Sequence, residues 1–283
     1  MKSAPFHYRR METLDELLGA LAAYGEAASI IAGGQSLVPL MNLRMARPEL
    51  LLDINRLTEL SAIRVEGDTL VIGALARHAE VLQSEAVRRH APLIAAALPH
   101  VGHEAIRNRG TFGGSVSLAD PAAELPACCL ALEARLELAS LAGRRFVDAA
   151  DYFLGSYETA RKDDEVLLAA HIPALQADAV PYFQELSRRR GDYALAGLAA
   201  HARVAGGRFD DLRLVFFGVE DRPVRAMGAE AALAGTDGTD AAAAIAALDT
   251  DLEPIGDPQT SAEARRHLAG VLLRRAVAHW TEA

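Results

Sequence analysis

Two glycine pairs, each followed closely by a serine, carry the residue types best suited to binding a phosphate group. The first lies in Ala-Gly-Gly-Gln-Ser-Leu at residues 32–37, and the second in Thr-Phe-Gly-Gly-Ser at residues 111–115. We call these the first and second glycine segments. Glycine lets the main chain approach an anion without an obstructing Cβ and accepts positive φ. Consecutive N–H groups can then point at the anion, while serine hydroxyls donate to its oxygens.

Both segments are therefore predicted to contact one dinucleotide, most simply FAD. The predicted contact residues are Ala32, Gly33, Gly34, Gln35, Ser36, Leu37, Thr111, Phe112, Gly113, Gly114 and Ser115. Tight turns without a ligand are the alternative for any glycine pair. A third pair, Gly206-Gly207, is interpreted as a hairpin turn of that ordinary kind.

Three further side chains could face the same ligand. Asp120 and Glu124 are spaced one helical turn apart at a predicted helix start, where they either complement the helix dipole or accept hydrogen bonds from sugar hydroxyls. Tyr193 precedes an apolar stretch, where it is either an ordinary strand aromatic or a ring stacked near a flat cofactor. The spacing leaves both pairs of alternatives open.

Composition and charge exclude other classes of function. The net charge is −9 and no basic stripe is present, which argues against a nucleic-acid partner. No stretch reaches the length of a membrane span, no signal region is apparent, and a cytoplasmic protein is expected. The adjacent Cys128 and Cys129 supply no disulfide framework and no zinc or iron–sulfur ligand set. His100 and His103 lack a third ligand nearby, so no metal site is assigned. No arrangement of residues typical of a catalytic nucleophile or base stands out, so no catalytic residue is assigned either.

The elements expected around the first glycine segment form a small α/β unit. A strand over residues 6–10 is followed by a helix that Thr13 caps, with Glu16 as its capping-box partner. Strands at 29–32 and 49–54 follow. The first glycine segment thus begins at the carboxyl end of a strand, where ligands bind in such sheets.

Residues 56–176 are expected to form a second subdomain. Strands are predicted at 69–72, 136–139, 145–148 and 166–172, and helices at 78–83, 86–98 and 120–132. The last third, from residue 177, is expected to hold strands at 182–186, 196–204 and 212–218, followed by helices at 227–233, 241–248 and 261–279. The residue pattern thus predicts a soluble α/β dinucleotide binder without a visible catalytic base.

The longer motifs resemble the FAD-binding medium subunit of the molybdenum hydroxylase family, the carbon monoxide dehydrogenase and xanthine dehydrogenase type. AGGQSLVPLMNLRMARPELLLDINRL and IRNRGTFGGSVSLADPAAELPACCLALEA resemble that family's two FAD segments. DYFLGSYETARKDDEVLLAAHIP and RRRGDYALAGLAA resemble later landmarks in the same order. The resemblance covers about residues 5–280.

The resemblance implies an α+β fold. It consists of a two-part FAD-binding domain of the vanillyl-alcohol-oxidase/PCMH type over 1–176, with subdomains at about 1–55 and 56–176. A small C-terminal three-stranded antiparallel sheet with helices would occupy 177–283. It also implies that Asp120 and Glu124 lie beside the ribityl and phosphate region and that Tyr193 lies near the isoalloxazine ring.

The implied function is electron transfer through FAD. A partner large subunit would carry the molybdenum cofactor, a small subunit two [2Fe–2S] clusters, and the three would form a heterotrimer that can itself dimerise. This sequence departs from some relatives after Phe183, where a lysine near the flavin is replaced by Gln184 and Glu185. A stand-alone FAD oxidoreductase of the same fold and a non-catalytic binding protein are the alternatives. An absorbance spectrum and co-purification with metal-containing partners would distinguish them.

Overall fold

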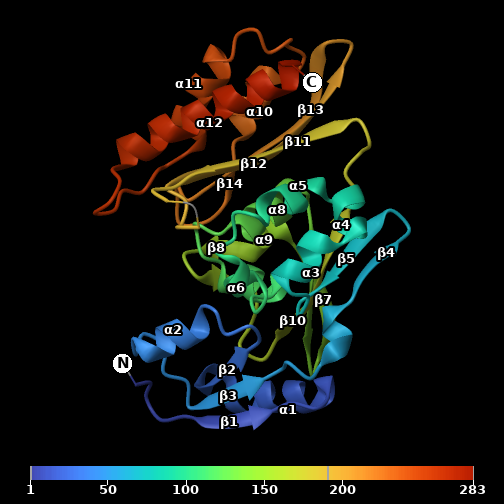
Figure 1. The fold of residues 1–283 in the computed structure, drawn as a ribbon, viewed down its shortest axis with the longest axis vertical. Helices are drawn as coiled ribbons and strands as arrows, with labels where there is room; N and C mark the ends of the chain where they lie inside the picture. Colours follow the sequence, from blue (N-terminus) through green and yellow to red (C-terminus); the bar gives the residue numbers. More distant parts are fainter. Residues whose placement is uncertain (1, 190, 283) are drawn as a thin grey trace.

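The computed structural model describes residues 2–189 and 191–282 and arranges them in three tiers (Figure 1). A small parallel sheet lies at one end, and a five-stranded sheet with helices lies in the middle. A four-stranded sheet with three helices, of which the last is the longest, lies at the other end. Within the described residues, no helix is both long enough and apolar enough to cross a membrane.

The first tier is the predicted small α/β unit. Its strands are parallel in the order β1-β3-β2. Thr13 Oγ1 accepts the Glu16 N–H at 3.2 Å, which confirms the cap, while the Glu16 carboxylate accepts the Glu12 N–H at 3.0 Å. The elements are β1 (His7–Arg10), α1 (Leu14–Tyr24), η1 (Gly25–Ala27), β2 (Ala28–Ile31), α2 (Leu37–Asn42) and β3 (Leu50–Asp53).

The middle tier is built on an antiparallel sheet in the order β4-β5-β10-β6-β7. Its strands are β4 (Ile63–Glu66), β5 (Thr69–Gly73), β6 (Arg135–Ser140), β7 (Gly143–Asp148) and β10 (Val166–Pro173), with a separate pair β8 (Phe153–Gly155) and β9 (Glu158–Thr159). Its helices are η2 (Thr58–Ser61), α3 (His78–Gln83), α4 (Glu85–His90), α5 (Pro92–Ala97), α6 (Glu104–Arg107), α7 (Phe112–Leu118), α8 (Glu124–Ala131) and α9 (Ala149–Tyr152).

Two helix predictions in this tier were wrong in their bounds. The single helix expected over 86–98 is two helices, because Pro92 cannot continue α4 and instead starts α5 at its first position. The helix expected to begin at Asp120 begins at Glu124. Asp120 instead forms a turn, in which its Oδ1 accepts the Ala122 N–H at 2.9 Å.

The third tier holds four strands rather than the predicted three. The order is β11-β12-β13-β14, all antiparallel, and the short fourth strand pairs with the end of β13. Gly206 and Gly207 form the hairpin turn between β12 and β13, as predicted. The elements are β11 (Ala179–Leu186), β12 (Ala196–Ala205), β13 (Arg208–Phe217), β14 (Val224–Arg225), α10 (Met227–Leu233), α11 (Ala242–Asp251) and α12 (Ala262–Glu282).

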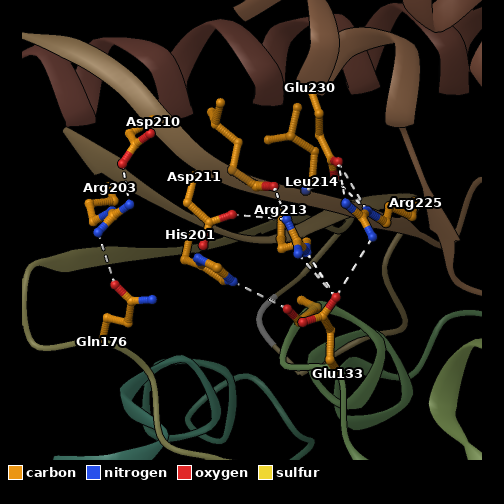
Figure 2. Close-up of polar contacts among 12 residues, drawn as sticks. Glu133, Gln176, His201, Arg203, Asp210, Asp211, Arg213, Leu214, Arg225 and Glu230 are labelled. Atoms are coloured by element: carbon orange, nitrogen blue, oxygen red, sulfur yellow. Dashed lines mark hydrogen bonds and ion pairs between the residues drawn. The ribbon is translucent and has the colours of Figure 1, made fainter. Parts of the chain in front are cut away.

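The second and third tiers share apolar and polar contacts. Ala199, Val215 and Phe217 belong to the same buried cluster as the middle tier. Outside this apolar cluster, the Glu133 carboxylate accepts a hydrogen bond of 3.1 Å from Arg213, which lies on β13 (Figure 2). This contact joins the residue after α8 to the C-terminal sheet. The sheet whose strand β12 follows Tyr193 is therefore anchored to the helix that begins with Glu124.

Candidate functional site

A cavity of about 480 Å³ opens between the first glycine segment, α7 and the chain that leads into β12. It is larger than one side chain could fill and lies within the range typical of ligand sites. The first tier contributes Leu21, Gly25, Ala28, Ser29, Ile30, Ile31, Ala32, Gly33, Gly34, Gln35, Ser36, Leu37 and Ile54. The middle tier contributes Ala74, His78, Val101, Gly102, Ile106, Gly110, Thr111, Gly113, Gly114, Ser115, Ser117, Leu118, Asp120, Ala123, Glu124, Arg161, Asp163, Val166 and Leu167. The chain before β12 contributes Gly191, Asp192 and Tyr193.

The first glycine segment presents unpaired backbone donors to this cavity. It leaves the sheet at the carboxyl end of β2, and Asn55 holds it there by donating to the Ala32 carbonyl at 2.9 Å. Gly34 has a φ of 71°, so the chain turns there as only glycine does readily. Within the described residues, the five N–H groups of residues 33–37 have no acceptor, although such groups are normally paired. Successive free N–H groups on a segment that lines a cavity are suited to binding an anion.

The second glycine segment differs from the expectation that it also presents its N–H groups. The N–H groups of Phe112 and Gly113 donate at 2.9 Å to the carbonyls of Ala76 and Ala74, which follow β5. The N–H groups of Gly114 and Ser115 donate at 3.1 Å to the Thr111 hydroxyl and carbonyl, respectively. Thr111 is the N-cap of α7, so this turn is paired within the protein. What the segment offers a ligand is the hydroxyl of Ser115, and Ser117, two residues further along α7, also lines the cavity.

Glycines in the two segments are needed for packing between chain segments. A Cβ at Gly33 would stand 2.2 Å from the Arg109 carbonyl oxygen, and a Cβ at Gly113 would stand 2.5 Å from the Ala74 Cβ. Neither distance is sterically possible without movement of backbone. The missing side chains therefore allow the loop after β2 to lie directly against the chain that enters α7.

Thirteen of the fourteen predicted contact residues line the cavity, and Phe112 does not. Its side chain is fully buried in the core of the middle tier. In the first turn of α7, successive side chains point about 100° apart, so a residue next to the ligand-facing positions turns into the core. The sequence motif could not separate these two directions.

Asp120 lines the cavity while held by its own neighbours. Besides the Ala122 N–H, its carboxylate accepts a 3.1 Å hydrogen bond from the Tyr157 hydroxyl, and this contact, with burial as the larger cause, raises the pKa of Tyr157 to about 12. The Gly218 N–H donates to the Pro121 carbonyl at 2.8 Å. The C-terminal tier therefore helps to position the turn that carries Asp120.

Glu124 lies at the start of α8 in an environment that favours its neutral form. Burial, together with the nearby charges of Glu185 and Asp120, raises its pKa to about 8. The Glu185 side chain is only 4% exposed; its Oε1 lies 3.4 Å from His100 Nδ1, and its Oε2 has no partner in the described residues. Glu185 stands in the segment where some relatives were expected to have a lysine, so the charge beside Glu124 is negative here.

Tyr193 lies at the open side of the cavity, and the residue is 70% exposed. It precedes β12 without packing in the core, which is not what an ordinary strand aromatic would do. His100 is engaged with Glu185, and no group of three potential metal ligands occurs within residues 2–189 and 191–282.

Several lining residues escaped the sequence reading. Arg161 is the one arginine or lysine among the lining residues of the described chain, and it lies inside the landmark DYFLGSYETARKDDEVLLAAHIP, which was the only available signal. His78, Gly110 and Ser117 lie outside the glycine pairs, and no spacing in the sequence relates His78 to them. Their place at the cavity follows from tertiary contacts.

Two family models match the chain over nearly its whole length. Residues 4–175 match the FAD binding domain in molybdopterin dehydrogenase. Residues 181–280 match the CO dehydrogenase flavoprotein C-terminal domain. The first match contains both glycine segments, and the second contains Tyr193 and the C-terminal sheet.

Individual relatives agree with these matches. The chain is 37% identical to 6-hydroxypseudooxynicotine dehydrogenase complex subunit alpha of Paenarthrobacter nicotinovorans, covering 98% of this chain and 95% of that one. It is 36% identical to the carbon monoxide dehydrogenase medium chain of Hydrogenophaga pseudoflava, with 96% of each chain covered.

Solved structures have the same fold along the whole chain. A carbon monoxide dehydrogenase from Hydrogenophaga pseudoflava superposes with a TM-score of 0.94 at 38% identity, covering 97% of this chain and 96% of that one. Quinoline 2-oxidoreductase from Pseudomonas putida 86 superposes with a TM-score of 0.94 at 37% identity, covering 100% and 99%.

Proposed function

Because this chain belongs to the family of FAD-binding medium subunits of molybdenum hydroxylases, we propose that it holds FAD in the cavity between its two glycine segments and passes electrons from a partner's iron–sulfur clusters to a terminal acceptor. It is the flavoprotein component of a multisubunit oxidoreductase. The division into an FAD-binding domain over 1–176 and a C-terminal domain over 177–283 is part of the proposal, supported by the limits of the two family matches.

The observation that carries the site assignment is the unpaired N–H array at residues 33–37. A pyrophosphate is the part of a dinucleotide that such an array fits, because it offers several anionic oxygens close together. The cavity has few cationic side chains, so backbone dipoles would supply most of the attraction. The hydroxyls of Ser36 and Ser115 face the same space and would add donors from the two segments.

The acidic residues suit the sugar portions of the cofactor. The Asp120 carboxylate, already oriented by the Ala122 N–H and Tyr157, would accept hydrogen bonds from hydroxyl groups. Glu124, neutral in the cofactor-free protein near pH 7, could donate one hydrogen bond as well as accept. Tyr193, exposed at the rim, is proposed to lie against the isoalloxazine ring.

Bound FAD supplies an isoalloxazine ring that takes up and releases electrons singly or in pairs. The chain's own contribution is to bind and orient this group and to leave one side of the cavity open. No residue of the described cavity is assigned the role of a catalytic acid, base or nucleophile toward an organic substrate.

The partners are proposed to be a large subunit with the molybdenum cofactor and a small subunit with two [2Fe–2S] clusters, in a heterotrimer that can dimerise. The relatives' designations as medium chains or subunits of complexes support a multisubunit assembly. Each [2Fe–2S] cluster takes four protein ligands, usually cysteines, whereas this sequence has two cysteines, both buried in α8. The clusters would therefore belong to other chains. We propose a cytoplasmic location for the assembly.

The test is anaerobic stopped-flow absorbance of the flavin, with the isolated FAD-loaded chain and with the assembled complex. The complex should show reduction of the flavin on addition of its substrate, whether a heterocycle, an aldehyde or carbon monoxide. The isolated chain should not respond to these substrates and should contain no iron or molybdenum. Substrate-driven bleaching by the isolated chain would instead establish the stand-alone oxidoreductase.

A further inference from the structure

His78 is buried at the cavity wall with one ring nitrogen paired and the other free. It is 5% exposed and lies at the first position of α3. Its Nε2 is 2.9 Å from the Thr111 carbonyl oxygen, and its Nδ1 has no partner within the described residues. Both His78 and Thr111 line the cavity.

The Thr111 contact determines which ring nitrogen carries the proton. A carbonyl oxygen can only accept, so Nε2 must be the donor in this hydrogen bond. In the neutral ring Nδ1 is then an acceptor whose lone pair has no partner within the described residues. Burial, together with the charges of Arg107 and Arg77, lowers the pKa of His78 to about 4, so the ring is neutral near pH 7.

The surrounding chain holds the ring rigidly. The His78 backbone N–H donates to the Gly110 carbonyl at 3.0 Å, and the ring donates to the next carbonyl along the same segment. Arg77 donates to the Arg109 carbonyl just before them. Three successive carbonyls are therefore bound by two successive residues, which leaves the ring little freedom to turn Nδ1 toward another partner.

Gly110 places no side chain against Nδ1. A Cβ at this residue would stand 3.0 Å from Nδ1 and 3.1 Å from Cε1 of the His78 ring. Nδ1 is itself buried, and glycine, which also lines the cavity, leaves the space beside it free of a side chain. Because an unsatisfied buried acceptor is costly, a donor is expected to fill this position.

We propose that His78 is a cofactor-binding residue whose Nδ1 accepts a hydrogen bond from a donor group of the bound dinucleotide, either a sugar hydroxyl or the adenine amino group. This inference rests on the proposed FAD site. It specifies the polarity of the contact: phosphate and flavin carbonyl oxygens are acceptors and cannot face Nδ1. His78 would thus join the N–H array of residues 33–37 as the complementary acceptor in a site otherwise rich in donors.

Two substitutions distinguish the roles of the two ring nitrogens of His78. Gln can reproduce the Nε2–H donor toward Thr111 while lacking the Nδ1 acceptor, whereas Asn can place an acceptor near the Nδ1 position while losing the donor to Thr111. The measurements are the FAD dissociation constant of the full-length chain co-purified with its partner subunits, and the melting temperature of the cofactor-free chain. His78→Gln should raise the FAD dissociation constant roughly five- to fiftyfold with a small change in melting temperature.

His78→Asn should show the opposite pattern, a lower melting temperature with a smaller loss of FAD affinity. Repeating the titration with the hypoxanthine analogue of FAD identifies the donor. If the analogue removes the difference between wild type and His78→Gln, the donor is the adenine amino group; if the difference persists, it is a sugar hydroxyl. Wild-type FAD affinity in His78→Gln would overturn the proposal and leave a buried water as the partner of Nδ1. Failure of the wild-type protein to bind FAD would instead refute the proposed function itself.

Discussion

The backbone of Gly33 lies directly against the carbonyl group of Arg109, so closely that a Cβ at Gly33 would stand 2.2 Å from that oxygen. This contact joins the loop that follows β2 to the segment that enters α7. It brings the unpaired N–H groups of the first glycine segment to the same cavity as the Ser115 hydroxyl. The two glycine segments therefore line one cavity because the first packs against the residues just before the second.

Gly33→Ala should lower both stability and FAD content. The added methyl meets backbone atoms of Arg109 and Gly110, which cannot move aside as a flexible side chain would. Overpacking of this kind costs about 1–3 kcal/mol. Gly19→Ala is the matched control, because a Cβ there meets nothing within 4 Å and lies in helix α1. Thermal unfolding and flavin absorbance measure both variants; full FAD occupancy in Gly33→Ala would contradict the packing argument.

Gly34→Ala should weaken FAD binding by at least about tenfold through its backbone conformation. Its φ is 71°, and alanine in this left-handed region costs about 1–2 kcal/mol, which favours a rearranged loop without the N–H array. Gly207→Ala provides the control, since Gly207 has a φ of 74° in an open hairpin far along the chain from the cavity. Both variants should lose similar stability, and only Gly34→Ala should raise the FAD dissociation constant. Equal FAD affinity in the two variants would disprove the role of residues 33–37.

The free energy of unfolding of the cofactor-free protein should fall as the pH rises, because Glu124 is protonated in the folded state. Its pKa is raised from 4.5 to about 8 in the folded chain, so the folded state holds a proton that the unfolded state has already released. The stability from this group is complete below about pH 4.5 and is lost as pH rises toward 8, at about 1.4 kcal/mol for each unit of pKa difference. Urea unfolding of wild type and Glu124→Gln between pH 5 and 8 tests this. Glutamine cannot ionise, so an identical pH slope in both proteins would remove Glu124 as the cause.

Glu124→Ala should also weaken FAD binding, by roughly ten- to hundredfold, if the side chain bonds to sugar hydroxyls as proposed. The loss should be largest for alanine, because glutamine retains a carbonyl acceptor and N–H donors. Fluorescence titration with FAD distinguishes the two variants. An unchanged dissociation constant in Glu124→Ala would return this residue to the role of a helix-start acid.

Glu230→Ala should destabilise the C-terminal tier by about 2–4 kcal/mol. The Glu230 side chain accepts the Leu214 N–H at 2.8 Å and pairs with Arg225 at 2.8 Å, and its removal leaves both donors without this partner (Figure 2). Glu66→Ala is the control, because the exposed Glu66–Arg64 ion pair should contribute less than about 1 kcal/mol. Chemical denaturation measures both. Equal losses of unfolding free energy in the two variants would contradict a larger contribution from the buried Glu230 contacts.

Much of the fold could be read from local patterns. Short stretches rich in apolar residues located β2, β3 and β12, and the Thr13 cap predicted the start of α1. The same reading joined α4 and α5 and missed β14, because a proline break inside an alanine-rich stretch and a two-residue strand leave weak signals. The family resemblance supplied the FAD assignment and the multisubunit role, which the family matches bear out.

The sequence by itself located the two glycine segments and indicated that they suit an anion, because glycine leaves the backbone accessible and serine carries a hydroxyl donor. Only the tertiary structure decided how each residue is used. Within the described residues, it showed that residues 33–37 keep their N–H groups free while residues 112–115 use theirs internally. It also showed that Phe112 turns into the core and that Nδ1 of His78, a residue of the cavity wall, has no partner. The physical reason is that hydrogen-bond satisfaction and pKa depend on partners distant in the chain. The partner of His78 lies 33 residues away, and the charge that acts on Glu124 comes from Glu185 on a strand of another tier.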